Sequence, residues 1–443
     1  MRIQLSDHFT YRRLIRFTLS TILMLVCSSL YSIVDGFFVS NFVGKTSFAA
    51  VNLIMPVAMS VGTVGFMIGT GGSAIVSKTL GEGDRGRANQ YFSMLVYLAA
   101  GLSLLLGAAG CLLMPPIARA LGAQGALLAE AVVYGRILFL AQPFFILQMV
   151  FQSFFVTAEK PVLSLKINIL AGLTNMVLDY LFIAVLPWGV AGAAIATAMG
   201  QAVGGLAPLC YFARQNDSLL RLGPARFCGR VILQTCFNGS SEMVSNLSAS
   251  VVNILYNFQL MRLAGEDGIA AYGVIMYVNF IFIAIFLGYS LGSAPVVSFH
   301  YGAKNHRELQ NLFRKSLYLL GFLGVALTLL AELLNGPLVA LFASYDPQLF
   351  AMTCRGFRIY SLAFLVMGIS IWSSSFFTAL NNGGVSAAIS FLRTLVFQIA
   401  AGLALPALWG VDGVWWAIVV AELLALGVTA AFLVGQRGRY HYL

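Results

Sequence analysis

The chain contains twelve apolar runs, each of about 20 residues or more, separated by short polar segments. At about 1.5 Å per helical residue, such a run crosses the roughly 30 Å of hydrocarbon in a bilayer. Charged residues make up only 9% of the sequence, against roughly 25% in soluble domains. We therefore predict an all-α polytopic membrane protein with transmembrane helices near residues 15–39, 50–76, 91–113, 132–156, 163–186, 190–212, 234–260, 269–297, 314–335, 352–377, 386–408 and 412–434.

Lysine and arginine are distributed unequally over the two sides of the membrane that these spans define. Of 26 such residues, 20 fall on the side that holds both termini, the segment Arg214 to Arg230 and Arg393. By the positive-inside rule we predict a multi-pass protein of the bacterial inner membrane with both termini cytoplasmic. The net charge of +10 arises from these loop clusters and does not indicate a nucleic-acid partner. The first run is longer than a signal-peptide core and no small-x-small cleavage site follows it, so we expect it to remain as a membrane helix.

A shift of 221 residues superimposes the two halves of the sequence without gaps. Such a constant offset indicates a duplication, because apolar composition alone would match at any register. The recurring residues include Ala49, Ala50, Ile54, Met55 and Val57 as Ala270, Ala271, Ile275, Met276 and Val278; Gly71, Ser77, Gly81 and Phe92 as Gly292, Ser298, Gly302 and Phe313; and Trp188–Gly192 as Trp409–Gly413. Each half has an even number of spans. We therefore predict a parallel repeat of two six-helix lobes, residues 1–213 and 234–443, joined by a basic linker, residues 214–233, and rocking about a central cleft.

Acidic residues inside predicted spans need an explanation, since a charge there costs roughly 2.5–3.5 kcal/mol. Asn175 and Asp179 stand at i and i+4 on one face of the fifth helix. Asp35 of the first helix and Thr197 of the sixth would complete a polar pocket. One repeat later the sequence has Tyr256, Val396, Ala400 and Ile418, so the second half lacks this set. We predict a coupling-ion site for H⁺ or Na⁺ at Asp35, Asn175, Asp179 and Thr197. The alternative is a structural hydrogen-bond cluster or a pair of interfacial acids.

A second polar set follows the seventh helix. Its members, Glu242, Asn246, Asn253 and Asn257, fall on one face at helical spacing. Gln148 and Gln152 form a shorter i, i+4 pair on the fourth helix. We expect these six residues to line a substrate cleft, in which aromatic side chains would bind lipophilic cations. The alternative is a hydrated seam between helices near the cytoplasmic end.

Motifs for other function classes are absent from the sequence. The six cysteines and four histidines show no metal-ligand spacing, and no catalytic constellation is present. The segment Gly69-Thr70-Gly71-Gly72 lies inside an apolar span without a Walker lysine, so it indicates close helix packing and not a phosphate loop. We expect neither an enzyme nor a cofactor. The expected partners are small molecules and membrane lipids, and a duplicated chain forms a cleft as a monomer.

Several segments together resemble the multidrug and toxic compound extrusion (MATE) transporters over essentially the whole chain. They are Tyr31-Ser32-Ile33-Val34-Asp35, Ala74 to Asp84, Glu242, Asn257, Ala270-Ala271-Tyr272-Gly273 and Ser298-Phe299-His300-Tyr301-Gly302. The resemblance implies a V-shaped pair of lobes that exports cationic or amphiphilic compounds in exchange for H⁺ or Na⁺ by alternating access. The family's first-lobe ion site matches Asp35, Asn175, Asp179 and Thr197 residue by residue.

The sequence departs from the family pattern at two places. No proline lies between Ile15 and Val34, so a proline-driven bend of the first helix is not expected. The tenth helix has Trp372 and Ser373 to Ser375 but no acid, which argues against a second-lobe cation site of the kind that some members have. Two other functions remain alternatives, a lipid or oligosaccharide flippase of the same superfamily and a non-transporting receptor or scaffold.

Overall fold

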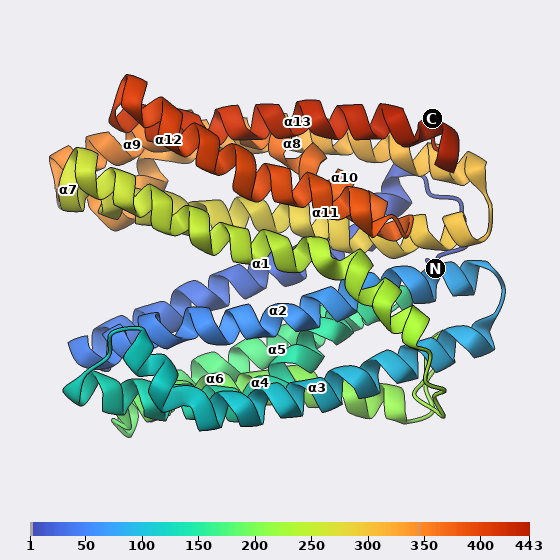
Figure 1. Cartoon of the computed structure of the whole chain (residues 1–443), viewed down its shortest axis with the longest axis horizontal. Coiled ribbons are helices and arrows are strands. Elements are labelled where there is room, and N and C mark those ends of the chain that lie inside the picture. Colours follow the sequence, from blue (N-terminus) through green and yellow to red (C-terminus); the bar gives the residue numbers. More distant parts are fainter. Residues whose placement is uncertain (1–2, 345) are drawn as a thin grey trace.

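A computed structural model describes residues 3–344 and 346–443, apart from the side chains at positions 37, 40, 41 and 45. All regular elements in this part of the chain are helices, and they lie roughly parallel to one another (Figure 1). Their bounds are α1 Tyr11–Phe42, α2 Lys45–Gly81, α3 Arg85–Ala120, α4 Gly125–Thr157, α5 Pro161–Asp179, η1 Tyr180–Val185, α6 Gly189–Ala213, α7 Gly229–Gly302, α8 His306–Ala343, α9 Pro347–Ser361, α10 Phe364–Ala379, α11 Gly383–Phe391, η2 Leu392–Val396, α12 Phe397–Trp409 and α13 Val411–Tyr440.

The described helices account for twelve membrane spans. Ten helical stretches are long and apolar enough to cross a bilayer, and α9 with α10 forms an eleventh span bent by 51°. The twelfth comes from α7, which combines the predicted seventh and eighth helices. Its 74 residues are interrupted at Gly265, whose φ of 64° and ψ of −147° are non-helical and easily adopted by glycine. The predicted all-α architecture of twelve spans is confirmed.

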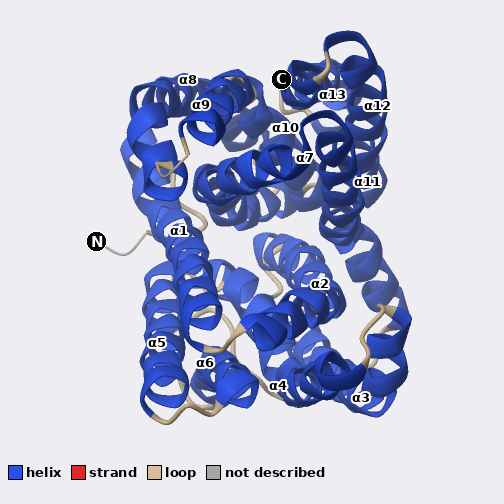
Figure 2. Cartoon of the chain, turned by 90° about the vertical axis from the view of Figure 1, so that its left-hand side faces the viewer, coloured by secondary structure: helices blue, strands red, loops and turns tan. Residues whose placement is uncertain are grey.

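The helices form two groups that repeat the same local structure. Figure 2 shows α1–α6 in one group and α7–α13 in the other, viewed along the helices. Asp84 caps the start of α3 by accepting from the Arg87 amide, and Asn305, one repeat later, caps α8 by accepting from the Glu308 amide. These equivalent caps show that the sequence repeat is a structural repeat.

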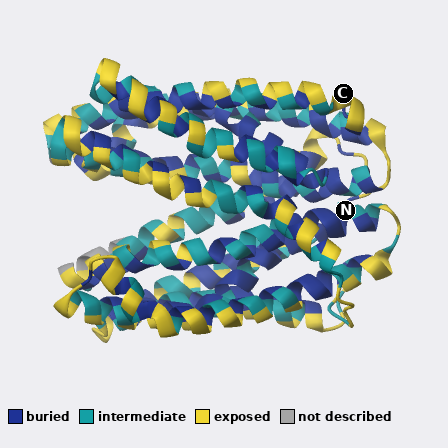
Figure 3. Cartoon of the chain, in the orientation of Figure 1, coloured by how far each residue is buried: buried dark blue, intermediate teal, exposed yellow. Residues whose placement is uncertain are grey.

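The two lobes converge at the end that carries both termini and diverge toward the other end, as the arms of a V (Figure 1). Figure 3 shows the same division in burial, with dark, buried segments where the lobes meet and exposed residues along the outer faces. Many of the exposed side chains are large and apolar, including Leu104, Leu105, Phe322 and Leu333. Such outer faces suit contact with lipid chains. The arrangement of the two lobes in Figure 1 confirms the V-shape that the family resemblance predicts.

Glycines of α2 and α7 close the narrow end of the V. A Cβ atom added to Gly81 would lie 2.0 Å from the Phe299 carbonyl oxygen, and one added to Gly302 would lie 2.0 Å from the Lys78 carbonyl oxygen. Phe299 and Gly302 follow Lys78 and Gly81 by one repeat of 221 residues. The two backbone contacts are therefore equivalent across the pseudo-two-fold axis that relates the lobes. We call them the glycine seam.

The same symmetry continues further along the interface. An added Cβ at Gly71 of α2 would lie 2.8 Å from the Gly239 nitrogen, and one at Gly292 of α7 would lie 3.0 Å from Thr18 Cα. These pairs are again related by the 221-residue offset. Only residues without a side chain allow helices to approach this closely. The lobes thus contact each other backbone to backbone on both sides of the axis.

Residues 3–10, the N-terminal strap, connect the lobes at the closed end. The Leu5 amide donates to Glu159 Oε1 at 2.7 Å, between α4 and α5 of the first lobe. The Phe9 amide donates to Glu308 Oε1 at 2.8 Å, on α8 of the second lobe. The side chains of Leu5 and Phe9 are fully buried. The strap therefore contacts both lobes through hydrogen bonds and apolar packing.

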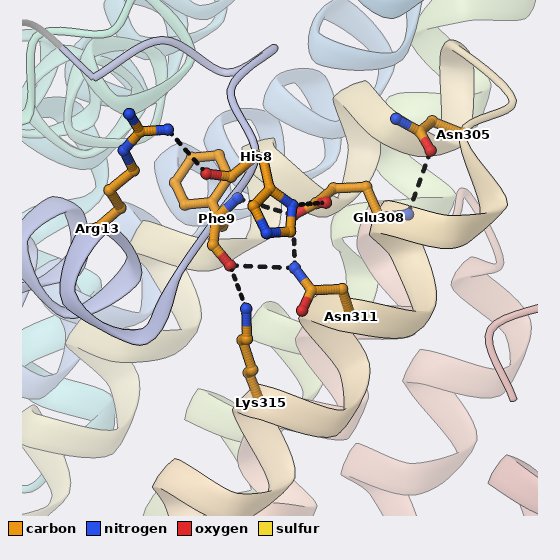
Figure 4. A network of polar contacts seen from close by, with 7 residues as sticks. All are labelled: His8, Phe9, Arg13, Asn305, Glu308, Asn311 and Lys315. Carbon is orange, nitrogen blue, oxygen red and sulfur yellow. Dashed lines mark hydrogen bonds and ion pairs between the residues drawn. The ribbon is translucent and has the colours of Figure 1, made fainter.

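Figure 4 shows how α8 holds the strap. His8 Nδ1 lies 2.6 Å from Glu308 Oε2, so this carboxylate contacts the strap through both oxygens. Asn311 Nδ2 and Lys315 Nζ donate to the Phe9 carbonyl oxygen at 3.0 and 2.6 Å. Charge-assisted hydrogen bonds of this kind are stronger than neutral ones. The strap is therefore fixed to the second lobe, and the chain then continues into α1 of the first lobe.

The segment between the lobes, residues 214–228, has no helix, and α7 begins at Gly229, slightly earlier than predicted. This segment lies against the first lobe. Arg85 Nη2 donates to the Ser218 carbonyl oxygen at 2.8 Å, and Lys160 Nζ lies 2.6 Å from Asp217 Oδ2. The hydrogen bond from Lys160 lowers the pKa of the Asp217 carboxyl group.

The glycine seam predicts an effect of adding one methyl group. Gly81→Ala should lower the stability of the folded protein by about 1–3 kcal/mol, because the new Cβ atom meets a backbone oxygen that has no rotamer to change. Thermal unfolding of the purified protein in detergent measures this. Gly101→Ala in α3 is the matched control, since no atom lies within 4 Å of its added Cβ. Equal unfolding temperatures for the two variants would contradict the seam.

Candidate functional site

Two carboxylates lie together inside the first lobe. Asp35 projects from α1 and Asp179 from the end of α5, and their carboxylates lie close enough to influence each other electrostatically. Asp35 is 9% exposed and Asp179 is fully buried. α1 and α5 lie side by side in this lobe (Figure 2). The structure thus brings together two acids that are 144 positions apart in the sequence.

The backbone changes its helical form at Asp179. This residue ends the regular α-helix α5, and the wider π-helical segment η1 follows directly, from Tyr180 to Val185. π-helical turns within helices occur frequently at functional sites. Asn175 precedes Asp179 by one α-helical turn and lies beside Asp35. Asn175 and Asp179, the predicted i, i+4 pair on the fifth helix, therefore lie toward Asp35 of the first helix.

Polar atoms at this place lack partners among the described residues. Asp35 Oδ1, both carboxylate oxygens of Asp179 and Asn175 Nδ2 are buried and make no hydrogen bond with the protein. Buried polar groups are almost always satisfied, so each exception requires a reason. Carboxylate oxygens can bind H⁺ or Na⁺, and an amide oxygen can bind Na⁺. Among the described residues, no group of three or more His, Cys, Asp or Glu side chains could hold a metal ion.

Thr197 of α6 lines a separate small space between α6, α2 and α4. α6 packs closely on α5 one turn further on, where a Cβ added to Gly200 would lie 2.9 Å from Asn175 Cβ. Thr197 lines a cavity of about 10 Å³ with Gln142 and Gln201. A cavity of this volume has room for about one water molecule.

Two tyrosines belong to the same region and were not predicted from the sequence. Tyr134 of α4 is buried and lies within electrostatic range of both Asp35 and Asp179. Tyr31 stands one turn before Asp35 on α1, and its ring lies on Gly172 of α5, where an added Cβ would be 2.1 Å away. The sequence has 17 tyrosines and 34 phenylalanines, and no sequence spacing distinguishes Tyr31 and Tyr134 from the others as members of this site. The only available signal was the position of Tyr31 one turn before the acid.

The equivalent place in the second lobe contains a neutral hydrogen bond. Tyr256 occupies the position one repeat after Asp35, and its hydroxyl group bonds to Gln398 Oε1 at 2.5 Å. Tyr256 is 1% exposed. The two lobes therefore share a scaffold but differ in charge at the corresponding site.

A different charged cluster lies in the second lobe. Arg393 Nε is 2.9 Å from Glu422 Oε2, and their side chains are only 13% and 2% exposed. Arg393 belongs to η2 in the middle of the eleventh span and Glu422 to the middle of α13. The sequence counted Arg393 among the basic residues of the cytoplasmic side, and the structure adds that its side chain lies within the bundle beside a buried carboxylate. Glu422 was visible in the sequence as an acid within a predicted span and was not identified.

The polar stripe on α7 runs along the first half of that helix. Asn246 Nδ2 donates to the Glu242 carbonyl oxygen at 2.8 Å, and Asn257 Nδ2 donates to Asn253 Oδ1 at 3.3 Å. Asn246 and Asn253 are exposed, whereas Glu242 and Asn257 are half-buried. Glu242 lies within electrostatic range of Arg393. The structure thus places the stripe next to the charged cluster of the second lobe.

Gln148 and Gln152 of α4 lie inside the first lobe. They line a cavity of about 10 Å³ together with Asn168 of α5 and Gly204 of α6. An added Cβ at Gly204 would lie 2.5 Å from Gln148 Cδ, so the glutamine side chain fills the space beside the glycine. Their role in a substrate cleft stays a prediction.

Comparisons with known proteins agree with this architecture. The MatE family model matches residues 20–181 and 242–403, two stretches that begin close to one repeat apart. The multidrug export protein MepA of Staphylococcus haemolyticus (strain JCSC1435) is 24% identical over 431 residues, which are 97% of this chain and 94% of the relative. MepA of Staphylococcus aureus (strain MRSA252) is 23% identical over 416 residues, which are 94% and 91% of the two chains.

Solved structures share the fold over almost their full length. The crystal structure of MATE in complex with MaL6 matches with a TM-score of 0.93 at 21% identity, covering 98% of both chains. The outward-facing conformation of a multidrug resistance MATE family transporter of the MOP superfamily matches with a TM-score of 0.92 at 22% identity, also covering 98% of both chains. The fold expected from the sequence resemblance is confirmed.

The pair formed by Arg393 and Glu422 predicts a large effect on stability. Glu422→Gln should lower the unfolding free energy by about 3–5 kcal/mol, because it leaves a buried guanidinium group without its counter-charge. Asp412→Asn breaks the more exposed pair with Arg355 and should cost about 1 kcal/mol or less. Thermal unfolding of both variants in detergent measures the difference. A Glu422→Gln protein as stable as Asp412→Asn would show that the pair does not stabilise the lobe.

Proposed function

We propose that this chain, which belongs to the multidrug and toxic compound extrusion (MATE) family, exports cationic or amphiphilic small molecules by antiport with H⁺ or Na⁺. The related proteins named multidrug export proteins match over nearly the whole chain, which supports drug-like substrates. The membrane-spanning architecture supports transport between two aqueous compartments. The family is one of transporters and not of enzymes.

The observation that carries the proposal is the buried pair of Asp35 and Asp179. Two carboxylates next to each other in a poorly solvated site repel when both are ionised, so binding one cation stabilises the pair. The unpartnered carboxylate oxygens are placed to bind that cation, and Asn175 lies beside them. We assign Asp35 and Asp179 to ion binding, with Asn175 and Thr197 completing the site. Binding H⁺ or Na⁺ removes a negative charge and thereby weakens the attraction for a cationic substrate.

Exchange between the two compartments follows from the shape of the molecule. With the basic residues and both termini in the cytoplasm, the closed end of the V faces inward and the open end faces outward. Rocking the lobes about the glycine seam would close the outer end and open the inner one. An ion bound at Asp35 lies on α1, which packs along α7 of the other lobe. The ion site is thus adjacent to an element that contacts both lobes.

The substrate contacts are assigned to the polar stripe of α7. Glu242 supplies a negative charge close to Arg393, and Asn246, Asn253 and Asn257 supply hydrogen-bonding groups along the same helix. A cleft with few polar groups and many aromatic ones suits lipophilic cations. We assign Gln148 and Gln152 to the same cleft, from the side of the first lobe.

The other functions considered for the sequence are less well supported. A lipid or oligosaccharide flippase and a non-transporting receptor or scaffold are not favoured, because relatives that match nearly the whole chain are named as multidrug exporters. Both lobes of the V come from one chain, so we propose a functional monomer.

Transport in proteoliposomes tests the proposal. The wild type should move a fluorescent lipophilic cation against its gradient when a pH or Na⁺ gradient is imposed. Each tenfold gradient of the coupling ion supplies about 1.4 kcal/mol, enough for about a tenfold opposite gradient of a cation exchanged one for one. Asp35→Asn keeps the shape of the side chain but removes the charge, so transport should fall to the passive rate.

Asp84→Asn is the matched control for this experiment. Asp84 caps α3 at the surface, and asparagine caps helices equally well, so transport should be unchanged. Normal transport by Asp35→Asn would exclude Asp35 from the ion site. Failure of the wild type to move any cation under either gradient would overturn the proposed antiport.

A further inference from the structure

A cavity of about 330 Å³ lies where α1 begins and α8 passes its first turns. Tyr11 contributes from α1, and Arg307, Arg314, Lys315 and Tyr318 contribute from α8. α1 is part of the first lobe and α8 part of the second, so the cavity spans the junction of the lobes. It lies at the closed end of the V, next to the N-terminal strap.

The charge of this cavity is entirely positive. Three cationic side chains line it, and none of its lining residues is acidic. Lys315 is already engaged, since Nζ bonds the Phe9 carbonyl oxygen and lies 5.3 Å from the centre of the Tyr11 ring. Among the described residues, Arg307 and Arg314 have neither an ion-pair nor a hydrogen-bond partner. The nearby carboxylate of Glu308 is occupied by His8 and the Phe9 amide. Two arginines are therefore available to an anion.

Apolar side chains extend from the mouth of the cavity along both helices. On α8, Tyr318 and Phe322 are each 71% exposed and follow Arg314 at intervals of four residues. On α1, Ile15 and Leu19 are exposed and follow Tyr11 at the same interval. Residues four apart lie above one another on a helix. A basic cavity is thus continuous with two apolar stripes that run into the membrane.

We infer that this cavity binds an anionic phospholipid of the cytoplasmic leaflet, with its phosphate between Arg307 and Arg314 and its acyl chains along the stripes of α1 and α8. Basic pockets between membrane helices on this side are suited to acidic head groups. A free phosphate ion would satisfy the arginines but would leave the apolar stripes unused. The inference relies on the membrane orientation proposed above and is independent of drug transport. A lipid in this place would contact both lobes beside the strap.

Lipid binding to the purified full-length protein tests the inference. The protein in detergent is titrated with phosphatidylglycerol or with phosphatidylcholine, and bound lipid is counted by native mass spectrometry. The wild type should bind phosphatidylglycerol more tightly than the neutral lipid. Arg307→Gln/Arg314→Gln should weaken phosphatidylglycerol binding about 30-fold, as expected for two surface charges. High salt should reduce the difference between the two lipids.

Arg226→Gln/Arg437→Gln is the matched control, because these arginines are exposed on the same side of the membrane but lie outside the cavity. This variant should bind phosphatidylglycerol as the wild type does. Equal binding by the Arg307→Gln/Arg314→Gln variant, or equal affinity for both lipids, would overturn the site. Displacement of phosphatidylglycerol by millimolar inorganic phosphate would instead identify a soluble-anion site and overturn the lipid assignment. None of these results depends on transport, so they are separable from a failure of antiport.

Discussion

The backbone contact between α2 and α7 is the constraint on which the rest of this structure depends. Gly81 and Gly302 each lie so close to a carbonyl oxygen of the other lobe that no side chain fits between them. The two contacts are equivalent by the 221-residue repeat, so the lobes meet on both sides of one axis. At these backbone contacts, small rotations of one lobe against the other need little repacking of side chains. The contacts therefore suit a pair of lobes that rock.

The duplication also explains where the chain can differ between its halves. Both lobes keep the glycines of the seam and the caps of α3 and α8, which the architecture requires. At the position of Asp35 the second lobe has Tyr256, bonded to Gln398. Its own buried charges, Arg393 and Glu422, neutralise each other. Among the described residues, the buried carboxylate oxygens without a partner all lie in the first lobe, and this asymmetry supports an ion site there.

Much of the fold could be predicted from the sequence because membrane helices are specified by the length of apolar runs. The repeat offset also identified Gly71, Gly81, Gly292 and Gly302, and all four lie at the lobe interface. The i, i+4 spacing of Asn175 and Asp179 predicted their common face. Local patterns of this kind survive in the structure because a helix fixes them.

The parts that could not be predicted depend on contacts between distant segments. The strap bonds Glu159 and Glu308 through backbone amides, and backbone amides carry no sequence signal. Tyr134 lies within electrostatic range of the acid pair from α4, although it is far from both acids in the sequence. The sequence counted Arg393 on the cytoplasmic side but gave no sign that its side chain is buried against an acid. Its partner Glu422 lies 29 residues away on another helix.

The central claim is that Asp35 and Asp179 hold a cation that competes with the substrate. The most direct measurement is the release of H⁺ or Na⁺ when a lipophilic cation binds to the purified protein in weakly buffered detergent solution. Mutual weakening of two ligands is reciprocal, so the account predicts release of about one ion per bound substrate from the wild type and none from Asp35→Asn. The same release from both proteins would contradict it.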